Sequence, residues 1–248
     1  MVEKTITIYE GDCLKIMPEK VFDESVNMIL VDLPYGITQN KWDIIIPFDK
    51  LWEQYHRIIK PNGAMVFTAT QPFASRLVMS NLKFFRYDIV WEKTISSGQM
   101  NINNQPLRSH ELILVFYKKL PTYNEQRTKG TPYEINRTGK YKAGSYNPQR
   151  PSSKKNDGFR HARSVIKIPN PRMKDGHPTQ KPIKLLEYLI KTYTNVGDVV
   201  MDNCMGAGTT GIACRNLNRK FIGIEIDKTY FQKAKKALDE EIYNRFFS

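Results

Sequence analysis

A glycine-rich turn between an apolar strand and a helix most limits how this chain can fold. The run DVVMD (198–202) leads into Gly206, Gly208 and Gly211, which have the spacing G-x-G-x-x-G and open a helical pattern. Glu225 ends the next apolar run, 19 residues after Gly206. Glycines there let the backbone approach a ligand closely, and a carboxylate offers acceptors to ribose hydroxyls. The unit therefore predicts an α/β sheet that binds an adenosine-containing cofactor.

The turn alone does not select the cofactor, and a tight turn without a ligand is the alternative interpretation. Two observations favour S-adenosylmethionine over NAD. Only one strand follows the turn, so the rest of the sheet must come from the N-terminal half. Asp202 stands just before the glycines. A carboxylate at that place repels a pyrophosphate but attracts a cation, and S-adenosylmethionine carries an ammonium and a sulfonium.

The remaining chain alternates short apolar runs with helical patterns. We expect strands at 5–9, 27–31, 64–69, 84–91, 111–119, 198–202 and 220–226, and helices at 51–59, 72–80, 182–193, 209–217 and 228–241. This alternation predicts a parallel sheet with helices on both faces. The longest apolar run is LILVFY at 112–117, whereas a membrane-spanning helix needs about 18 residues. We therefore expect no membrane association.

Positive charge is concentrated in one stretch of the chain. The whole sequence has a net charge of +13, and residues 118–170 alone hold 13 basic and 3 acidic residues, a net of +10. The stretch has only five Val, Ile, Leu or Met residues, too few for a core of its own. We interpret it as a basic surface insert in a domain made of 1–117 and 171–248. Such a field suits a polyanion such as nucleic acid, although it also suits a merely solvated surface.

The run NMILV leads into the tetrapeptide Asp32-Leu33-Pro34-Tyr35. Ligands of open α/β sheets bind beyond the carboxyl ends of strands, so these residues are placed for chemistry. Asp32 and the Leu33 carbonyl can accept hydrogen bonds from an amino group, and Pro34 stiffens the turn. Tyr35 offers a face on which a flat heterocycle can stack. A β-turn after a buried strand, with Tyr35 only packing, is the alternative.

Together these motifs carry a resemblance. DLPYG at 32–36, followed by a basic segment and then DNCMGAGTTG at 202–211, resembles the β group of amino-methylating DNA methyltransferases, which act on adenine N6 or cytosine N4. GDCLKIMP (11–18) and HPTQKP (177–182) resemble two further motifs of that family. The resemblance implies a Rossmann-like S-adenosylmethionine-dependent methyltransferase fold with a doubly wound mixed sheet, and a target-recognition role for 118–170.

The resemblance also assigns roles to residues. The tetrapeptide Asp32, Leu33, Pro34 and Tyr35 would be catalytic. The cofactor would contact Asp12, Cys13, Asp32, His177, Thr179, Gln180, Lys181, Asp202, Cys204, Gly206, Gly208, Thr209, Thr210, Glu225 and Ile226. DNA would contact Lys41, Trp42, Arg137, Lys140 and Lys142, with Lys93 as a weaker candidate for the DNA side. Two positions depart from the family pattern: Leu33 replaces a proline, and Cys204 replaces an aromatic residue.

The mechanism implied is direct attack of a flipped-out base on the cofactor's methyl group, with neither a cysteine nucleophile nor a metal. Asp at the first tetrapeptide position favours adenine, since cytosine-N4 enzymes of the family usually carry Ser there. The alternatives are a cytosine-N4 enzyme, an RNA or protein-amide methyltransferase, an NAD-dependent oxidoreductase, and a non-catalytic DNA-binding protein. Double-stranded DNA is the expected partner, and a homodimer and a companion restriction endonuclease remain open. The first residues lack the order of a signal peptide, so we expect a cytoplasmic protein.

Overall fold

The computed structural model describes residues 6–36, 43–137, 152–170 and 181–239. The chain forms two compact units. The first takes in residues 1–124 and 164–248, and the second takes in residues 125–163. Each unit is described by itself below.

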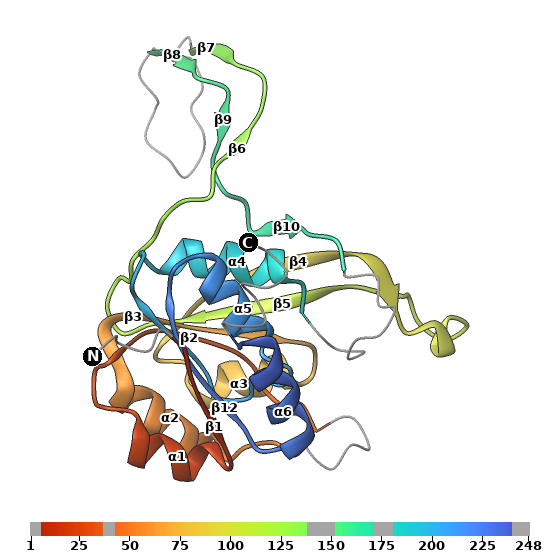
Figure 1. Cartoon of the computed structure of the whole chain (residues 1–248). Coiled ribbons are helices and arrows are strands. Elements are labelled where there is room, and N and C mark those ends of the chain that lie inside the picture. The colour runs from red at the N-terminus through yellow and green to blue at the C-terminus, as the bar shows by residue number, and fades with distance from the viewer. Residues whose placement is uncertain (1–5, 37–42, 138–151, 171–180, 240–248) are drawn as a thin grey trace. The chain divides into compact units, whose positions relative to one another are not determined.

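An eight-stranded sheet organises the first unit (Figure 1). In spatial order its strands are β1 (Ile6–Glu10), β12 (Lys220–Glu225), β11 (Val199–Asp202), β2 (Val26–Asp32), β3 (Ile59–Ala69), β5 (Arg108–Phe116), β4 (Phe85–Ser97) and β10 (Val165–Lys167). Neighbouring strands pair in parallel, except that β5 runs antiparallel to both β3 and β4. The doubly wound mixed sheet is thereby confirmed.

Helices cover both faces of this sheet. One face carries α1 (Cys13–Lys20), α2 (Phe48–Ile58) and α3 (Phe73–Ser80), and the other carries α4 (Ile183–Tyr193), α5 (Thr209–Asn216) and α6 (Lys228–Ala237). The period-two alternation of strand side chains sends Ile29 and Val31 to the first face and Met28 and Leu30 to the second. Each such buried side chain contributes roughly 1.5–3 kcal/mol. Within the described ranges, every helix is too short or too polar to cross a bilayer.

Most of the expected elements are present, and the differences have local causes. Helix α1 was not expected, because Pro18 lies inside it and only Cys13 and Met17 are buried. It begins because the side chain of Asp12 accepts a hydrogen bond from the backbone N–H of Leu14 at 2.9 Å, an N-cap. Strand β10 has three residues and was missed for its shortness. Helix α6 ends at Ala237, before the expected 241, and residues 240–248 lie outside the described ranges.

The second unit contains two short antiparallel strand pairs. β6 (Thr128–Lys129) pairs with β9 (Phe159–Arg160), and β7 (Tyr133–Arg137) pairs with β8 (Ser152–Asn156). None of its described residues belongs to either hydrophobic cluster. Instead, guanidinium groups lie over aromatic rings, as Arg160 does over Tyr133 at 4.6 Å. The unit is shorter than the insert expected at 118–170, because 118–124 and 164–170 fold with the first unit.

The pairing of β11 with β2 is the topological switch point of the sheet. These central strands pair in parallel, with Val200 opposite Met28 and Met201 opposite Ile29. The helices that follow them, α2 after β2 and α5 after β11, pack on opposite faces. A crevice therefore opens at their carboxyl ends, which is where open α/β sheets bind ligands.

The glycine-rich turn leaves β11 at this crevice. Gly206 has a φ of 53°, which glycine adopts without strain. A Cβ on Gly211 would lie 2.9 Å from Phe221 and from Leu238, so only glycine lets α5 pack this closely. From the opposite side, the Tyr55 hydroxyl of α2 donates a buried 2.6 Å hydrogen bond to Asn203 Oδ1. The turn is thus held from both faces.

Candidate active site

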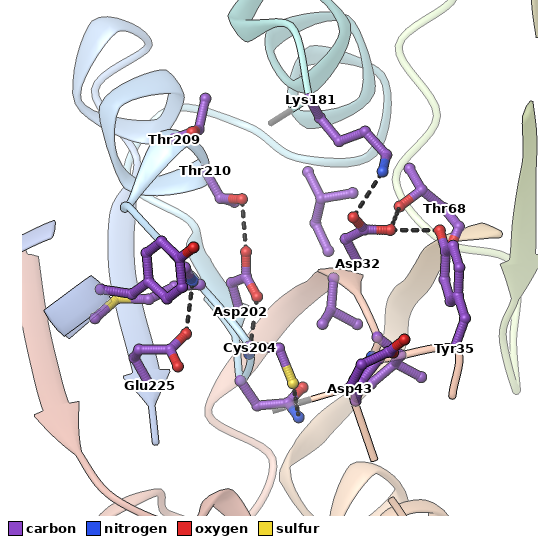
Figure 2. Close-up of a pocket in the computed structure, with 18 of the residues that line it drawn as sticks. Asp32, Tyr35, Asp43, Thr68, Lys181, Asp202, Cys204, Thr209, Thr210 and Glu225 are labelled. Atoms are coloured by element: carbon purple, nitrogen blue, oxygen red, sulfur yellow. Dashed lines mark hydrogen bonds and ion pairs between the residues drawn. The ribbon is translucent and has the colours of Figure 1, made fainter. Parts of the chain in front are cut away.

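A cavity of about 920 Å³ lies at the carboxyl edge of the sheet in the first unit. Its polar side chains form two groups on opposite sides (Figure 2). Asp202, Thr210 and Glu225 make up the first group, at the ends of β11 and β12 and the start of α5. Asp32, Tyr35, Thr68 and Lys181 make up the second, around the ends of β2 and β3 and the start of α4. We call these the acidic side and the tetrapeptide side.

On the acidic side, Asp202 is buried. Its Oδ2 accepts a hydrogen bond from Thr210 Oγ1 at 2.6 Å, and its Oδ1 accepts one from the backbone N–H of Cys204 at 3.1 Å. Burial raises the pKa of Asp202 to about 7, although both hydrogen bonds oppose the shift. A nearby cation would relieve the cost of the buried negative charge. The site therefore favours a positively charged ligand group.

Glu225 joins two loops on the same side. Its Oε2 accepts from the N–H of Gly206 at 2.8 Å, and its Oε1 accepts from the N–H of Asp227 at 2.8 Å. Burial raises the pKa of Glu225, and the backbone hydrogen bonds lower it in part. A carboxylate has about four lone-pair positions, so two bonds leave capacity for the hydroxyls of a ligand. Glu225 can serve the loop and a ligand together.

Two cysteines that line the cavity contact each other. Cys13 opens α1, and Cys204 lies in the glycine-rich turn. A hydrogen bond between the thiols lowers the pKa of Cys13 and raises that of Cys204. Their neighbour Asp12 lines the cavity and also caps α1. These contacts explain the local order of the loop, and the ligand contacts expected of all three residues stay predictions.

On the tetrapeptide side, Asp32 is held by three donors. Its Oδ1 accepts from Thr68 Oγ1 and from the Tyr35 hydroxyl, each at 2.5 Å. Its Oδ2 accepts from Lys181 Nζ at 2.6 Å. Burial and the charge of Asp32 raise the pKa of Tyr35 well above its ordinary value, so the phenol remains a donor. The carboxylate is therefore fixed in one orientation, with Phe73 packed 4.9 Å from the Tyr35 ring centre.

A chain of alternating charges extends from Asp32 into the sheet. Lys181 Nζ lies 3.3 Å from Glu111 Oε2, and Lys93 Nζ lies 3.2 Å from Glu111 Oε1. Lys181 is 11% exposed, Lys93 is 6% exposed and Glu111 is 14% exposed, so solvent screens their charges little. Burial disfavours the ammonium of Lys181, but Asp32 and Glu111 outweigh burial and raise its pKa. Lys181 is thus held in its charged form.

The structure brings most of the expected residues to this cavity. Those that line it are Asp12, Cys13, Asp32, Leu33, Pro34, Tyr35, Lys181, Asp202, Cys204, Gly206, Thr209, Thr210, Glu225 and Ile226. Gly208 is not among the lining residues, and Arg137 belongs to β7 of the second unit. The remaining expected residues lie outside the described ranges: Lys41, Trp42, Lys140, Lys142, His177, Thr179 and Gln180.

Sequence reasoning missed Thr68 and Glu111 and misjudged the surroundings of Lys93. Thr68 precedes the last residue of β3, and Glu111 faces Trp91 across β4 and β5 at the same edge of the sheet. A signal was available, because each is a polar residue next to an apolar run near the edge that carries Asp32. Lys93 was considered for DNA contact, whereas its ammonium is buried against Glu111.

Comparison with known proteins gives consistent matches. The DNA methylase family model N6_N4_Mtase matches residues 26–236. The type II methyltransferase M.HpaI of Haemophilus parainfluenzae is 31% identical over 91% of this chain and 72% of its own length. The DNA adenine methyltransferase YhdJ of Escherichia coli (strain K12) is 31% identical over 94% of this chain and 82% of its own.

Solved structures agree on the fold. The complex of M1.HpyAVI with S-adenosylmethionine (SAM) superposes with a TM-score of 0.64 at 29% identity, over 94% of this chain and all of that one. The PvuII cytosine-N4-specific DNA methyltransferase superposes with a TM-score of 0.68 at 18% identity, over 97% of this chain and 92% of that one. The latter similarity concerns the fold alone.

The raised pKa of Asp202 predicts a pH dependence of stability. The unfolded carboxyl titrates near 3.8 and the folded one near 7, so the folded state keeps a proton that the unfolded state has lost. This stabilisation is complete below pH 3.8 and is lost as the pH rises through 7. Asp202→Asn cannot ionise and should remove roughly 2–3 kcal/mol of the wild-type decline in unfolding free energy between pH 5 and 8.

Urea unfolding of the cofactor-free protein at both pH values measures this difference. Asp49→Asn, in the first turn of α2, is the control and should leave the decline unchanged. If Asp202→Asn and wild type decline equally, Asp202 does not hold a proton at neutral pH.

Proposed function

This chain belongs to the N6/N4 DNA methylase family, whose methyl donor is S-adenosylmethionine, and we propose a reaction for it on that basis. The proposed reaction moves the methyl group to the exocyclic N6 of an adenine flipped out of double-stranded DNA. The observation that carries it is the cavity itself. One side offers a buried carboxyl suited to a cation, and the other offers a fixed acceptor for an amino group.

The acidic side suits this cofactor. S-adenosylmethionine supplies a methyl group on a positively charged sulfur. Asp202, whose pKa is raised to about 7 by burial, gains from the cofactor's cationic amino-acid part. Glu225 can accept from ribose hydroxyls while it keeps the N–H groups of Gly206 and Asp227. Asp12 and the loop around Ile226 complete the proposed adenosine contacts, since both line the same side.

The tetrapeptide side suits an amino group. Asp32 Oδ2 and the Leu33 carbonyl would accept from the two N–H bonds of the target, which turns the nitrogen lone pair toward the methyl group. Tyr35 and Thr68 keep the carboxylate from rotating, and Lys181 holds its second oxygen. The methyl carbon exchanges its bond to sulfur for a bond to nitrogen, the sulfur keeps the electron pair of the broken bond, and the nitrogen must then lose one proton. Asp32 is the acceptor in this proposal, because Lys181 is kept charged by its two carboxylates.

We propose adenine as the target because the tetrapeptide begins with Asp32. The adenine enzyme YhdJ is among the relatives that support this choice. The alternative target is the N4 amino group of cytosine, because the chain shares its fold with the PvuII cytosine-N4 enzyme. Both bases present an exocyclic amino group, so the acceptors described above fit either one.

We propose that the second unit, residues 125–163, recognises the DNA target. It carries 10 basic and 3 acidic residues. The described residues of this unit form no apolar core, and most of their side chains are exposed to solvent, where a partner can reach them. Phosphate contacts from such a unit would supply affinity and fix the register of the duplex. Arg137, Lys140 and Lys142 remain the proposed contacts from the sequence, and Lys129, Lys154 and Lys155 are exposed lysines of the described part.

Expression in a host free of DNA methylation tests the reaction. Mass spectrometry of the nucleosides should find N6-methyladenine with the wild-type chain and none with Asp32→Ala, while calorimetric titration finds nearly unchanged SAM binding. Asp32→Asn should be milder, because its amide oxygen still accepts. N4-methylcytosine would favour the cytosine alternative, and wild-type activity in Asp32→Ala would remove Asp32 from the reaction.

The buried charge chain predicts a pH effect. Glu111→Gln removes one of the two carboxylates that raise the pKa of Lys181, so that pKa should fall. The loss of the Lys181 charge then begins at a lower pH, and the alkaline limb of kcat should move in the same direction. Glu92→Gln is the matched control, because it removes the more exposed pair with Lys167. KM for DNA should change little in Glu111→Gln. If the alkaline limb of kcat stays in place in this variant, Glu111 does not take part in the reaction.

The charge of the second unit predicts a salt effect. Replacing Lys129, Lys154 and Lys155 by Ala should weaken DNA binding and lower the slope of log K against log salt by about 3, if each contacts a phosphate. Fluorescence anisotropy with a duplex at several salt concentrations measures the slope. The control replaces three exposed lysines of the first unit: Lys15, Lys20 and Lys191. Equal slopes in the two triple variants would mean that the second unit does not contact the duplex.

A further inference from the structure

A long hairpin arm, residues 94–108, connects β4 to β5 in the first unit. Val90 of β4 and Ala69, the last residue of β3, both face Leu112 of β5. Seven more residues of β4 follow Val90, up to Ser97. At about 3.3 Å per residue, these carry the strand roughly 20 Å past the end of β3. Figure 1 shows this arm, in yellow, extending beyond the helices of its own unit.

The root of the arm is a wall of the cavity. Ile95, Ser97 and Arg108 line the cavity next to the tetrapeptide side. The root is also fixed in place, because Asn170 Oδ1 accepts from the backbone N–H of Thr94 at 3.0 Å and of Ile95 at 3.3 Å. Whatever the arm contacts is therefore held at a set distance from the place proposed for the target base.

The outer part of the arm is exposed and uncharged. Residues 94–107 contain no Lys, Arg, Asp or Glu, in a chain where such residues make up 25%. Met100 is 99% exposed and Ile102 is 59% exposed. Five amide side chains stand around them: Gln99, Asn101, Asn103, Asn104 and Gln105. Backbone hydrogen bonds such as Asn104 N–H to the Asn101 carbonyl, at 2.9 Å, shape the tip into compact turns.

This composition fits the interior of a duplex better than its phosphate surface. Phosphates are contacted by cations, which residues 94–107 lack. Amides match the hydrogen-bonding edges of bases, above all of adenine. Met and Ile are among the side chains that proteins insert between base steps. A second protein chain suits the arm less well, because its four exposed apolar side chains are interspersed with five amides, whereas a stable interface has a contiguous apolar centre.

We infer that the arm enters the duplex beside the target base, with Met100 filling the space that the flipped base leaves. The inference rests on the proposed function, since it needs a duplex as substrate. Flipping costs the stacking of the extruded base, and a side chain that occupies the gap offsets part of that cost. Methionine suits such an irregular space, because its unbranched chain has three rotatable bonds and a polarisable sulfur. Leu would be the conservative replacement, and Ala would leave the gap open.

The test uses the full chain and a duplex that contains the site found by sequencing DNA methylated by the wild type. Rates of methyl transfer are compared on two duplexes, one fully paired and one with a mismatch opposite the target base. Met100→Ala should be slower by about tenfold on the paired duplex and near wild type on the mismatched one, since an unpaired base is cheaper to flip. Met100→Leu should keep most of the rate. Met79→Ala is the matched control, because Met79 is 70% exposed on α3.

Other results would overturn the inference. An unchanged rate on the paired duplex, or an equal loss on both duplexes, would mean that Met100 does not assist flipping. A loss accompanied by a shift from dimer to monomer in sedimentation would make the arm a contact between copies of the chain. Thermal unfolding of Met100→Ala should be unchanged, because Met100 is exposed. That result would exclude a folding defect as the cause of a slower rate. If the wild-type protein methylates no DNA, the proposed function itself is wrong, and the proposed role of the arm is wrong with it.

Discussion

The parallel pairing of β11 with β2 is the contact on which the site depends. The two strands come from distant parts of the chain, yet their register places the ends that carry Asp202 and Asp32 side by side. The helices that follow leave for opposite faces, so neither covers the crevice. A shift of one residue in this register would exchange the buried faces of the strand. The hydrophobic clusters on both faces therefore specify the position of the two carboxylates.

The same cavity treats its acidic groups in two ways. Asp32 is neutralised from within the protein, because Lys181, Glu111 and Lys93 form a buried chain of alternating charge behind it. Asp202 accepts hydrogen bonds from Thr210 and Cys204 but forms no ion pair with any residue that the structure describes. Burial raises its pKa to about 7. One carboxylate is thus prepared as a fixed acceptor. The other is prepared for a cation that arrives from outside.

The sequence predicted the parts of this site that follow from local patterns. The glycine-rich turn, Glu225 at the end of a strand, and the tetrapeptide after an apolar run are all contiguous signals, and the structure brings them to one cavity. The charge chain could not be found in that way, because Lys181 and Asp32 are 149 residues apart. Helix α1 was hidden by Pro18 and by its small number of buried residues.

The limits of the basic unit were also beyond the sequence. Its composition indicated a region without a core, which the two short strand pairs of residues 125–163 agree with. Composition could not show that the flanks are structural. Three residues of one flank form β10, which pairs with β4, and that pairing depends on strands that lie 75 residues apart. Charge alone does not reveal such an attachment.

The attachment of the basic unit has a consequence for how such a chain can evolve. On one side, Asn124 donates its backbone N–H to the Thr192 carbonyl at 2.8 Å, and on the other Ser164 accepts from the N–H of Val90 at 2.7 Å. Both junctions are therefore secured by the first unit itself. A segment inserted between two anchored ends can be lengthened, shortened or exchanged at a small entropic cost, because loop closure grows only slowly with length. Substitutions within residues 125–163 are consequently uncoupled from the packing that orders the cavity. New variants of the basic unit can therefore arise without disturbing the cavity.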